Sequence, residues 1–179
     1  IKPDFAEAHS NLGTILRDLG KSQDAFDSYL KVIDINPTLS NIYASITRFL
    51  KDSDPSQLSK SKLKEILSIL LQKNDVTHKE LFNAFKFVYS NELIINLEKL
   101  DSDSSEIELL VNKKVIINAL KKITLKDIRL ENVLTNLRKY LCSKIIKKKE
   151  EISYSELQLT IALGEQCFLN EYVYSLTKE

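Results

Sequence analysis

The side chains that most often perform chemistry are few in this sequence and lie far apart. His9 and His78 have no cysteine or second histidine at the short spacings typical of metal ligands. Cys142 and Cys167 form no Cys-x-x-Cys motif and lie in stretches with helical spacing, so we expect buried, inert thiols. The sequence therefore predicts no metal site, and its cysteine usage fits a reducing compartment such as the cytoplasm.

Glycine-based catalytic motifs are also missing. The chain has three glycines, and it contains no Gly-rich phosphate loop and no G-x-S-x-G motif. A catalytic carboxylate pair cannot be singled out among 25 acidic residues. We therefore expect no catalytic and no cofactor-binding residue in this chain, and the sequence leaves open whether a parent protein is an enzyme.

Composition indicates an all-helical protein. Three glycines and three prolines are too few for the turns of a β-sandwich or an α/β fold. Hydrophobic residues make up 43% of the 179 residues and the net charge is only +1, which excludes a disordered chain and argues against attraction to polyanions. No apolar run approaches the roughly 18–20 residues of a membrane span, so we expect no membrane partner.

An internal repeat opens the chain, because Pro3 and Pro37 bracket the segment FAEAHSNLGTILRDLGKSQDAFDSYLKVIDIN. The offset between these two prolines sets a repeat period of about 34 residues. From Ala6 to Leu39 this segment resembles the tetratricopeptide repeat. His9 departs from the family pattern, which most often has Trp or Tyr there. The positions that carry the resemblance are Asn11, Leu12, Gly13, Leu16, Gly20, Ala25, Tyr29, Val32 and Pro37.

Two antiparallel helices that cross closely explain these residue types. Gly13 and Ala25 are small where the two backbones should approach. Leu12, Leu16 and Tyr29 are expected to fill the space around them. Gly20 suits a left-handed turn between the helices, and Pro37 ends the second helix.

A shift by one repeat period predicts a second, degenerate repeat over 40–73. The core positions stay apolar, since His9 maps to Tyr43 and Leu12 maps to Ile46, but Gly13 becomes Thr47. We therefore divide the chain into a repeat unit, 1–73, and a helical extension, 74–179. The chain has no methionine, and the residues before Asp4 resemble the tail of another repeat. We therefore expect the chain to be part of a longer polypeptide with another repeat upstream.

The extension continues with helical spacing of apolar residues. Capping boxes at Thr77 and Ser153 predict two helix starts, and a third is expected at Ser105. A long helix is expected over 127–146 and a short one over 92–100. The β-branched run 115–117 is the one place that favours a strand. The predicted fold is an all-α superhelix of stacked helical hairpins.

The resemblance also implies a binding groove, because in tetratricopeptide repeats the first helix of each hairpin lines one. An Asn amide there can pair with both groups of a peptide backbone, and an Arg can fork onto a carboxylate. A solvated helix face is the competing interpretation. The residues that the resemblance places toward the groove are Glu7, Ser10, Asn11, Thr14 and Arg17.

The C-terminal segment LTIALGEQCFLNEYVYSLTKE is similar to the helical linker that precedes the methyltransferase domain in some bacterial tetratricopeptide proteins. The resemblance rests on Ala162-Leu163, Gln166-Cys167-Phe168 and 170–174. It implies S-adenosylmethionine-dependent chemistry for a parent protein, with the catalytic domain after Glu179. It places no cofactor site in this chain.

A basic stretch lies at 106–149, with twelve Lys or Arg between Lys113 and Lys149. Such a stripe can bind phosphates, but Tyr140 is its only aromatic residue, and nucleic-acid binding usually needs more. The competing interpretation is a solvated face that pairs with the acidic C-terminal end. The favoured function is a peptide- or protein-binding arm of a larger bacterial protein. The alternative is the helical part of a methyltransferase, and a nucleic-acid binder comes third.

The absence of a Gly-rich loop generates a first prediction. The chain should not bind S-adenosylmethionine, because nothing in it can cradle the cofactor. Isothermal titration calorimetry checks this, and micromolar binding to this chain would contradict the domain assignment.

Overall fold

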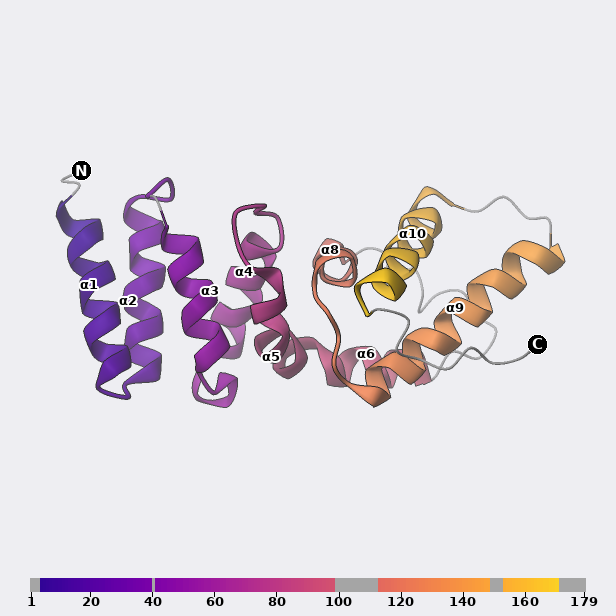
Figure 1. The fold of residues 1–179 in the computed structure, drawn as a ribbon, viewed down its shortest axis with the longest axis horizontal. Helices are drawn as coiled ribbons and strands as arrows, with labels where there is room; N and C mark the ends of the chain where they lie inside the picture. The colour runs from indigo at the N-terminus through magenta and orange to yellow at the C-terminus, as the bar shows by residue number, and fades with distance from the viewer. Residues whose placement is uncertain (1–3, 40, 99–112, 149–152, 171–179) are drawn as a thin grey trace. The chain divides into compact units, whose positions relative to one another are not determined.

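The computed structural model describes residues 4–39, 41–98, 113–148 and 153–170 (Figure 1). Helices are the regular elements throughout this part of the chain, and it contains no strand, which confirms the all-α prediction. The chain divides into two compact units, 1–88 and 89–179. The predicted boundary after residue 73 falls inside the first unit.

Two pairs of helices begin the first unit. They consist of α1 (Asp4–Asp18) with α2 (Ser22–Ile35), then α3 (Ile42–Asp52) with α4 (Lys60–Leu70). The 3-10 helix Pro55–Gln57 lies in the turn between α3 and α4, where Asp54 accepts a hydrogen bond from the backbone N–H of Ser56. Helices therefore form at the offsets that the repeat period predicts. Only α1 and α2 pack closely as a hairpin, because α3 makes few backbone contacts with α4 and packs instead on α2 and on residues 78–85.

The crossing of α1 and α2 depends on Gly13. A Cβ atom on this residue would lie 2.8 Å from Cε1 of Tyr29, closer than carbon atoms normally approach. Ala25 is completely buried, and the Tyr29 ring is 2% exposed. The small residues thus lie where the sequence predicts a close approach, and the aromatic ring fills the space that Gly13 leaves.

Gly20 ends α1 in the left-handed conformation, with φ of 73°. The N–H of Gly20 donates to the carbonyl of Arg17 and the N–H of Lys21 donates to the carbonyl of Leu16, both at 2.9 Å. This pair of bonds is the Schellman motif, which satisfies carbonyls that the helix end leaves open. The expected left-handed turn is confirmed.

Not every expected core residue is buried. Leu12 is 43% exposed and Leu16 is only half-buried, so the expectation that both fill the core around Gly13 is wrong for Leu12. The reason is helical geometry. Leu12 lies about 100° around α1 from Gly13, on the side that faces away from α2.

Aromatic rings join the two helix pairs. Phe49 of α3 stacks on Phe26 of α2, with ring centroids 5.9 Å apart, and contacts Tyr29 at 5.5 Å. On the other side of α2, Lys62 of α4 pairs with Asp27 at 2.8 Å. The helix α2 is therefore held from several sides within the first unit.

A 3-10 helix (His78–Leu81), α5 (Phe82–Phe85) and a π-helix (Lys86–Ser90) follow α4. Thr77 forms no side-chain cap, so the capping box predicted there is wrong. The backbone explains this, because a 3-10 turn and not a first α-helical turn follows Thr77.

The second unit contains α6 (Asn91–Glu98), α8 (Lys114–Lys122), α9 (Ile128–Lys148) and α10 (Tyr154–Leu169). The helices expected over 92–100 and 127–146 correspond to α6 and α9. The β-branched run 115–117 is helical, and the helix start expected at Ser105 lies outside the described residues. No described helix combines the length and the apolar character needed to cross a bilayer.

Buried polar groups tie α9 to the end of α10. Glu131 is 2% exposed and forms an ion pair with Arg138. The Asn170 amide donates to Glu131 at 3.2 Å, and the Asn170 amide oxygen accepts from the N–H of Leu125 at 3.2 Å. Glu131 and Asn170 thus have partners out of water, which such buried groups require, whereas Nη1 of Arg138 is buried with no hydrogen-bond partner among the described residues.

The predicted capping box at Ser153 is confirmed. The Ser153 hydroxyl accepts from the N–H of Glu156, and the Glu156 carboxylate accepts from the N–H of Ser153. Lys144 of α9 donates to the same carboxylate. The Lys144 ammonium, with the Ser153 hydrogen bonds, lowers the pKa of Glu156.

The Gly13 contact predicts a change in stability. Gly13→Ala should lower the free energy of unfolding by about 1–3 kcal/mol, because the new methyl group must displace the buried Tyr29 ring. Gly164 of α10 is the matched control, since a Cβ atom there meets open space. Gly164→Ala should raise stability by about 0.5–1 kcal/mol. Urea denaturation of both variants checks this, and equal effects would contradict the close crossing.

The Glu156 cluster predicts a pH dependence. Its folded-state pKa is lowered, so the ionised carboxylate stabilises the fold above its unfolded pKa of about 4.3, and this contribution is lost as the pH falls through the folded-state value. Glu156→Gln should cost about 1–3 kcal/mol at pH 7 and progressively less in acid. The more exposed Glu165, 3.9 Å from Lys121, is the control, and Glu165→Gln should cost less than about 1 kcal/mol. Denaturation at several pH values checks both.

Candidate functional site

Three faces divide the surface of α1. One packs on α2 through Ala6 and Gly13, which are both buried. A second is polar and carries the five residues that sequence analysis placed toward a groove. A third is apolar and exposed. The polar side chains are Glu7, Asn11, Thr14 and Arg17, which are exposed, and Ser10, which is half-buried.

Tyr29 lies beneath the polar face and links it to α3. The Tyr29 hydroxyl is 3.2 Å from the Thr14 hydroxyl, and the Tyr29 ring contacts Phe49 of α3. Thr14 also donates to the Ser10 carbonyl at 3.2 Å. Tyr29 therefore contacts both α1 and α3 and supports the polar face from beneath.

Arg17 is already engaged. Its Nε and Nη2 atoms donate to one carboxylate oxygen of Asp18, at 3.0 and 2.8 Å. The hydrogen bonds to Asp18 raise the pKa of Arg17. Its guanidinium fork is thus turned toward a neighbour of the same helix, and an incoming carboxylate must compete with Asp18. Asn11 has no hydrogen-bond partner among the described side chains.

The second helix pair supplies a cation that sequence analysis did not name. Arg48 of α3 stands one repeat period after Thr14, is exposed, and forms no ion pair with any described residue. Lys51, at the position equivalent to Arg17, lies 3.5 Å from Glu80. The shift by one repeat period maps Thr14, a residue that the resemblance places toward the groove, onto Arg48, so the sequence contains the signal for this cation.

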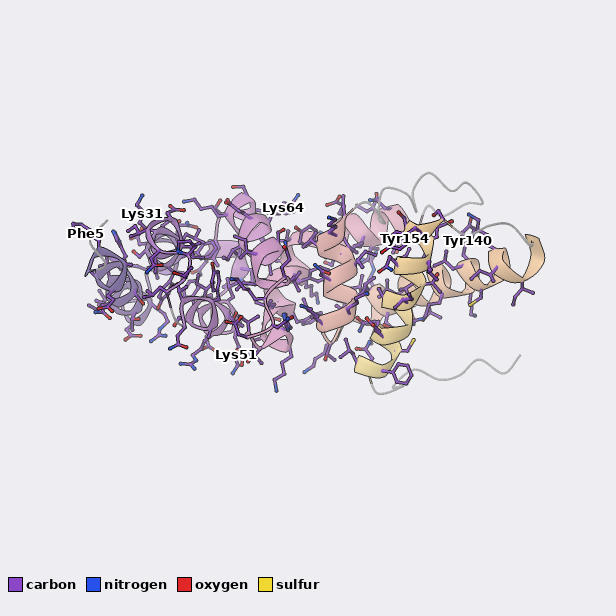
Figure 2. The ribbon with its side chains drawn as sticks, turned by 90° about the horizontal axis from the view of Figure 1, so that it is seen from above. Phe5, Lys31, Lys51, Lys64, Tyr140 and Tyr154 are labelled. Carbon is purple, nitrogen blue, oxygen red and sulfur yellow. The ribbon has the colours of Figure 1, made fainter. Side chains whose placement is uncertain are left out.

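Figure 2 places Lys51 on one side of the first unit and Lys31 and Lys64 on the opposite side. The side of α3 that carries Lys51 and the sides of α2 and α4 that carry Lys31 and Lys64 are therefore separate surfaces. On the α2 and α4 side a groove of about 330 Å³ is lined by Leu30, Ile66 and Ile69 and crossed by the Asp27–Lys62 ion pair. This groove has no counterpart in the sequence-based expectations.

A second concavity lies in the second unit, between α8 and α10. It has a volume of about 360 Å³, and its lining includes Lys114, Lys121 and Tyr154. Tyr154 is an exposed aromatic residue at the first turn of α10. This pocket could hold an anion only weakly, because Lys121 already faces Glu165.

At least five of the twelve basic residues of the stretch 106–149 pair with described acids of their own unit. Because each pair neutralises charge locally, the stripe offers phosphates less free charge than its sequence suggests. The ion pairs described there are Lys113–Glu92, Lys121–Glu165, Arg129–Glu98, Arg138–Glu131 and Lys144–Glu156.

No group of three or more metal-ligating side chains occurs among the described residues. His78 is half-buried, with Nε2 2.9 Å from the Lys73 carbonyl, and His9 is also half-buried. Cys142 is exposed and Cys167 is half-buried, so the expectation of buried thiols is wrong for Cys142. Cys142 lies on the outer side of α9, away from its buried neighbour Leu141.

Comparisons with protein-family models, with curated proteins and with solved structures found no match to this chain. The segment that resembles a methyltransferase linker is described only as far as Asn170, and the part from 171 to 179 lies outside the described residues. The two resemblances from the sequence therefore stay predictions.

Proposed function

We propose that this chain is a peptide-binding helical-repeat module, in which the two helix pairs of the first unit stack as tetratricopeptide-like repeats. The observation that supports this most directly is the pair of helices α1 and α3 above Tyr29. These helices stand one repeat period apart and display exposed polar side chains, Asn11 and Arg48, that bond to no described side chain.

The chemistry of this face favours an extended, acidic peptide. Asn11 offers an amide donor and acceptor that can pair with the backbone of any peptide. Arg48 offers a guanidinium that can fork onto an acidic side chain or a free carboxylate. Arg17 contributes less than its sequence position suggests, because Asp18 holds its guanidinium.

The module would act as the targeting arm of a larger protein in the bacterial cytoplasm. Two unpaired cysteines fit a reducing compartment, and the ion pairs of the second unit reduce the free charge that its basic residues offer to nucleic acid. The chemistry of any attached domain lies outside this proposal.

A peptide array probed with the protein and its variants tests the proposal. Asn11→Ala should weaken all bound peptides by a similar factor. Arg48→Ala should weaken acidic peptides about tenfold and neutral ones little, because it removes a cation of the face that no described acid neutralises. Arg17→Ala should have the smaller effect. Raised salt should mimic Arg48→Ala, since the face is open to water.

Lys31→Ala provides the control, because Lys31 is also an exposed cation of the first unit and lies on the opposite side from Lys51 (Figure 2). It should leave every peptide unchanged. Equal binding by the wild type, Asn11→Ala and Arg48→Ala would mean that the polar face is only solvated and would refute the proposal.

A further inference from the structure

The third face of α1 is an exposed apolar stripe, distinct from the polar face. Four large side chains on it are between 43% and 65% exposed, and Figure 2 shows Phe5 at the outer edge of α1. Their spacing of three and four residues keeps them in one row along the helix. The residues of this outer stripe are Phe5, Ala8, Leu12, Ile15 and Leu19.

The residues of α3 that correspond to the outer stripe are buried. A shift by one repeat period carries Ala8, Leu12 and Ile15 onto Ile42, Ile46 and Phe49 of α3. Those three side chains are at most 2% exposed.

At Phe49, the neighbour that covers this row of α3 is α2. Phe49 stacks on Phe26 and contacts Tyr29, both of which belong to α2. Ile15 of the outer stripe holds the register position of Phe49 and is 56% exposed. Helix α1 thus carries the residues of an internal helix of the stack, and no described residue covers its second side.

We propose that the outer stripe of α1 binds an amphipathic helix of the α2 kind, presented by a further helical hairpin. The partner helix would carry a small residue followed by aromatic and β-branched side chains, as α2 does with Ala25, Phe26, Tyr29 and Val32. Its aromatic rings would cover Ile15 and Leu12 in the way that Phe26 and Tyr29 cover Phe49.

A second copy of this chain fits the outer stripe less well. In that copy the complementary face of α2 is already buried against α3, so only another outer stripe could meet this one. A hairpin that continues the stack brings its own internal packing with it.

A lactam-bridged peptide with the sequence of residues 21–36 is the probe. The lactam joins Asp27 to Lys31, which both line the groove toward α4, so it holds the helix without touching the aromatic face. Circular dichroism first establishes that the peptide is helical. Fluorescence anisotropy with the full chain should then show saturable binding, which the peptide change Phe26→Ser should weaken about tenfold or more.

Ile15→Glu in the protein should weaken binding to the same extent. Ile95→Glu is the matched control, because Ile95 is 52% exposed on α6 of the second unit, and it should leave binding unchanged. No saturable binding of the helical peptide, or binding that Ile15→Glu leaves unaltered, would overturn the proposal. Dimerisation in analytical ultracentrifugation that Ile15→Glu abolishes would also overturn it and assign the stripe to a second copy. Asn11→Ala should not affect this peptide, which separates the test from that of the polar face.

Discussion

The first unit depends on the contact between Gly13 and the ring of Tyr29. Because Gly13 has no Cβ, the buried ring can lie against the backbone of α1, with its hydroxyl beside Thr14 and its edge against Phe49 of α3. One aromatic side chain thereby fixes α1, α2 and α3 together. A close-packed interior of this kind deforms little when volume is added, which is why a single extra methyl group should be costly.

The same contact produces the two surfaces of functional interest. With Gly13 turned toward α2, helical geometry turns the polar residues of α1 to one side and the row of Leu12 and Ile15 to another. The polar side can hold a peptide only through exposed groups such as Asn11, so its affinity should be modest and salt-sensitive. The apolar side gains free energy by covering carbon surface, so its partner should be a packed helix and should tolerate salt.

The second unit is built on an aliphatic core, with paired acids buried beside it. Glu131 is buried and satisfied by Arg138 and Asn170, while Glu156 is held by Lys144 and the Ser153 cap. Breaking one partner of such a cluster leaves an unpaired charge out of water, which costs more than the intact pair contributes. The basic residues that looked like a phosphate-binding stripe in the sequence are in part the counterions of this unit.

The sequence by itself determined the helical class, the close hairpin of α1 and α2, the left-handed turn at Gly20 and the cap at Ser153, because each follows from local backbone preferences or fixed offsets. It also placed the polar residues of α1 on one face. Only the tertiary structure decided that Leu12 is exposed, that Asp18 occupies Arg17, and that no described acid pairs with Arg48. These outcomes depend on which neighbour covers each side of a helix and on distances between side chains, and periodicity along one chain carries no information about either.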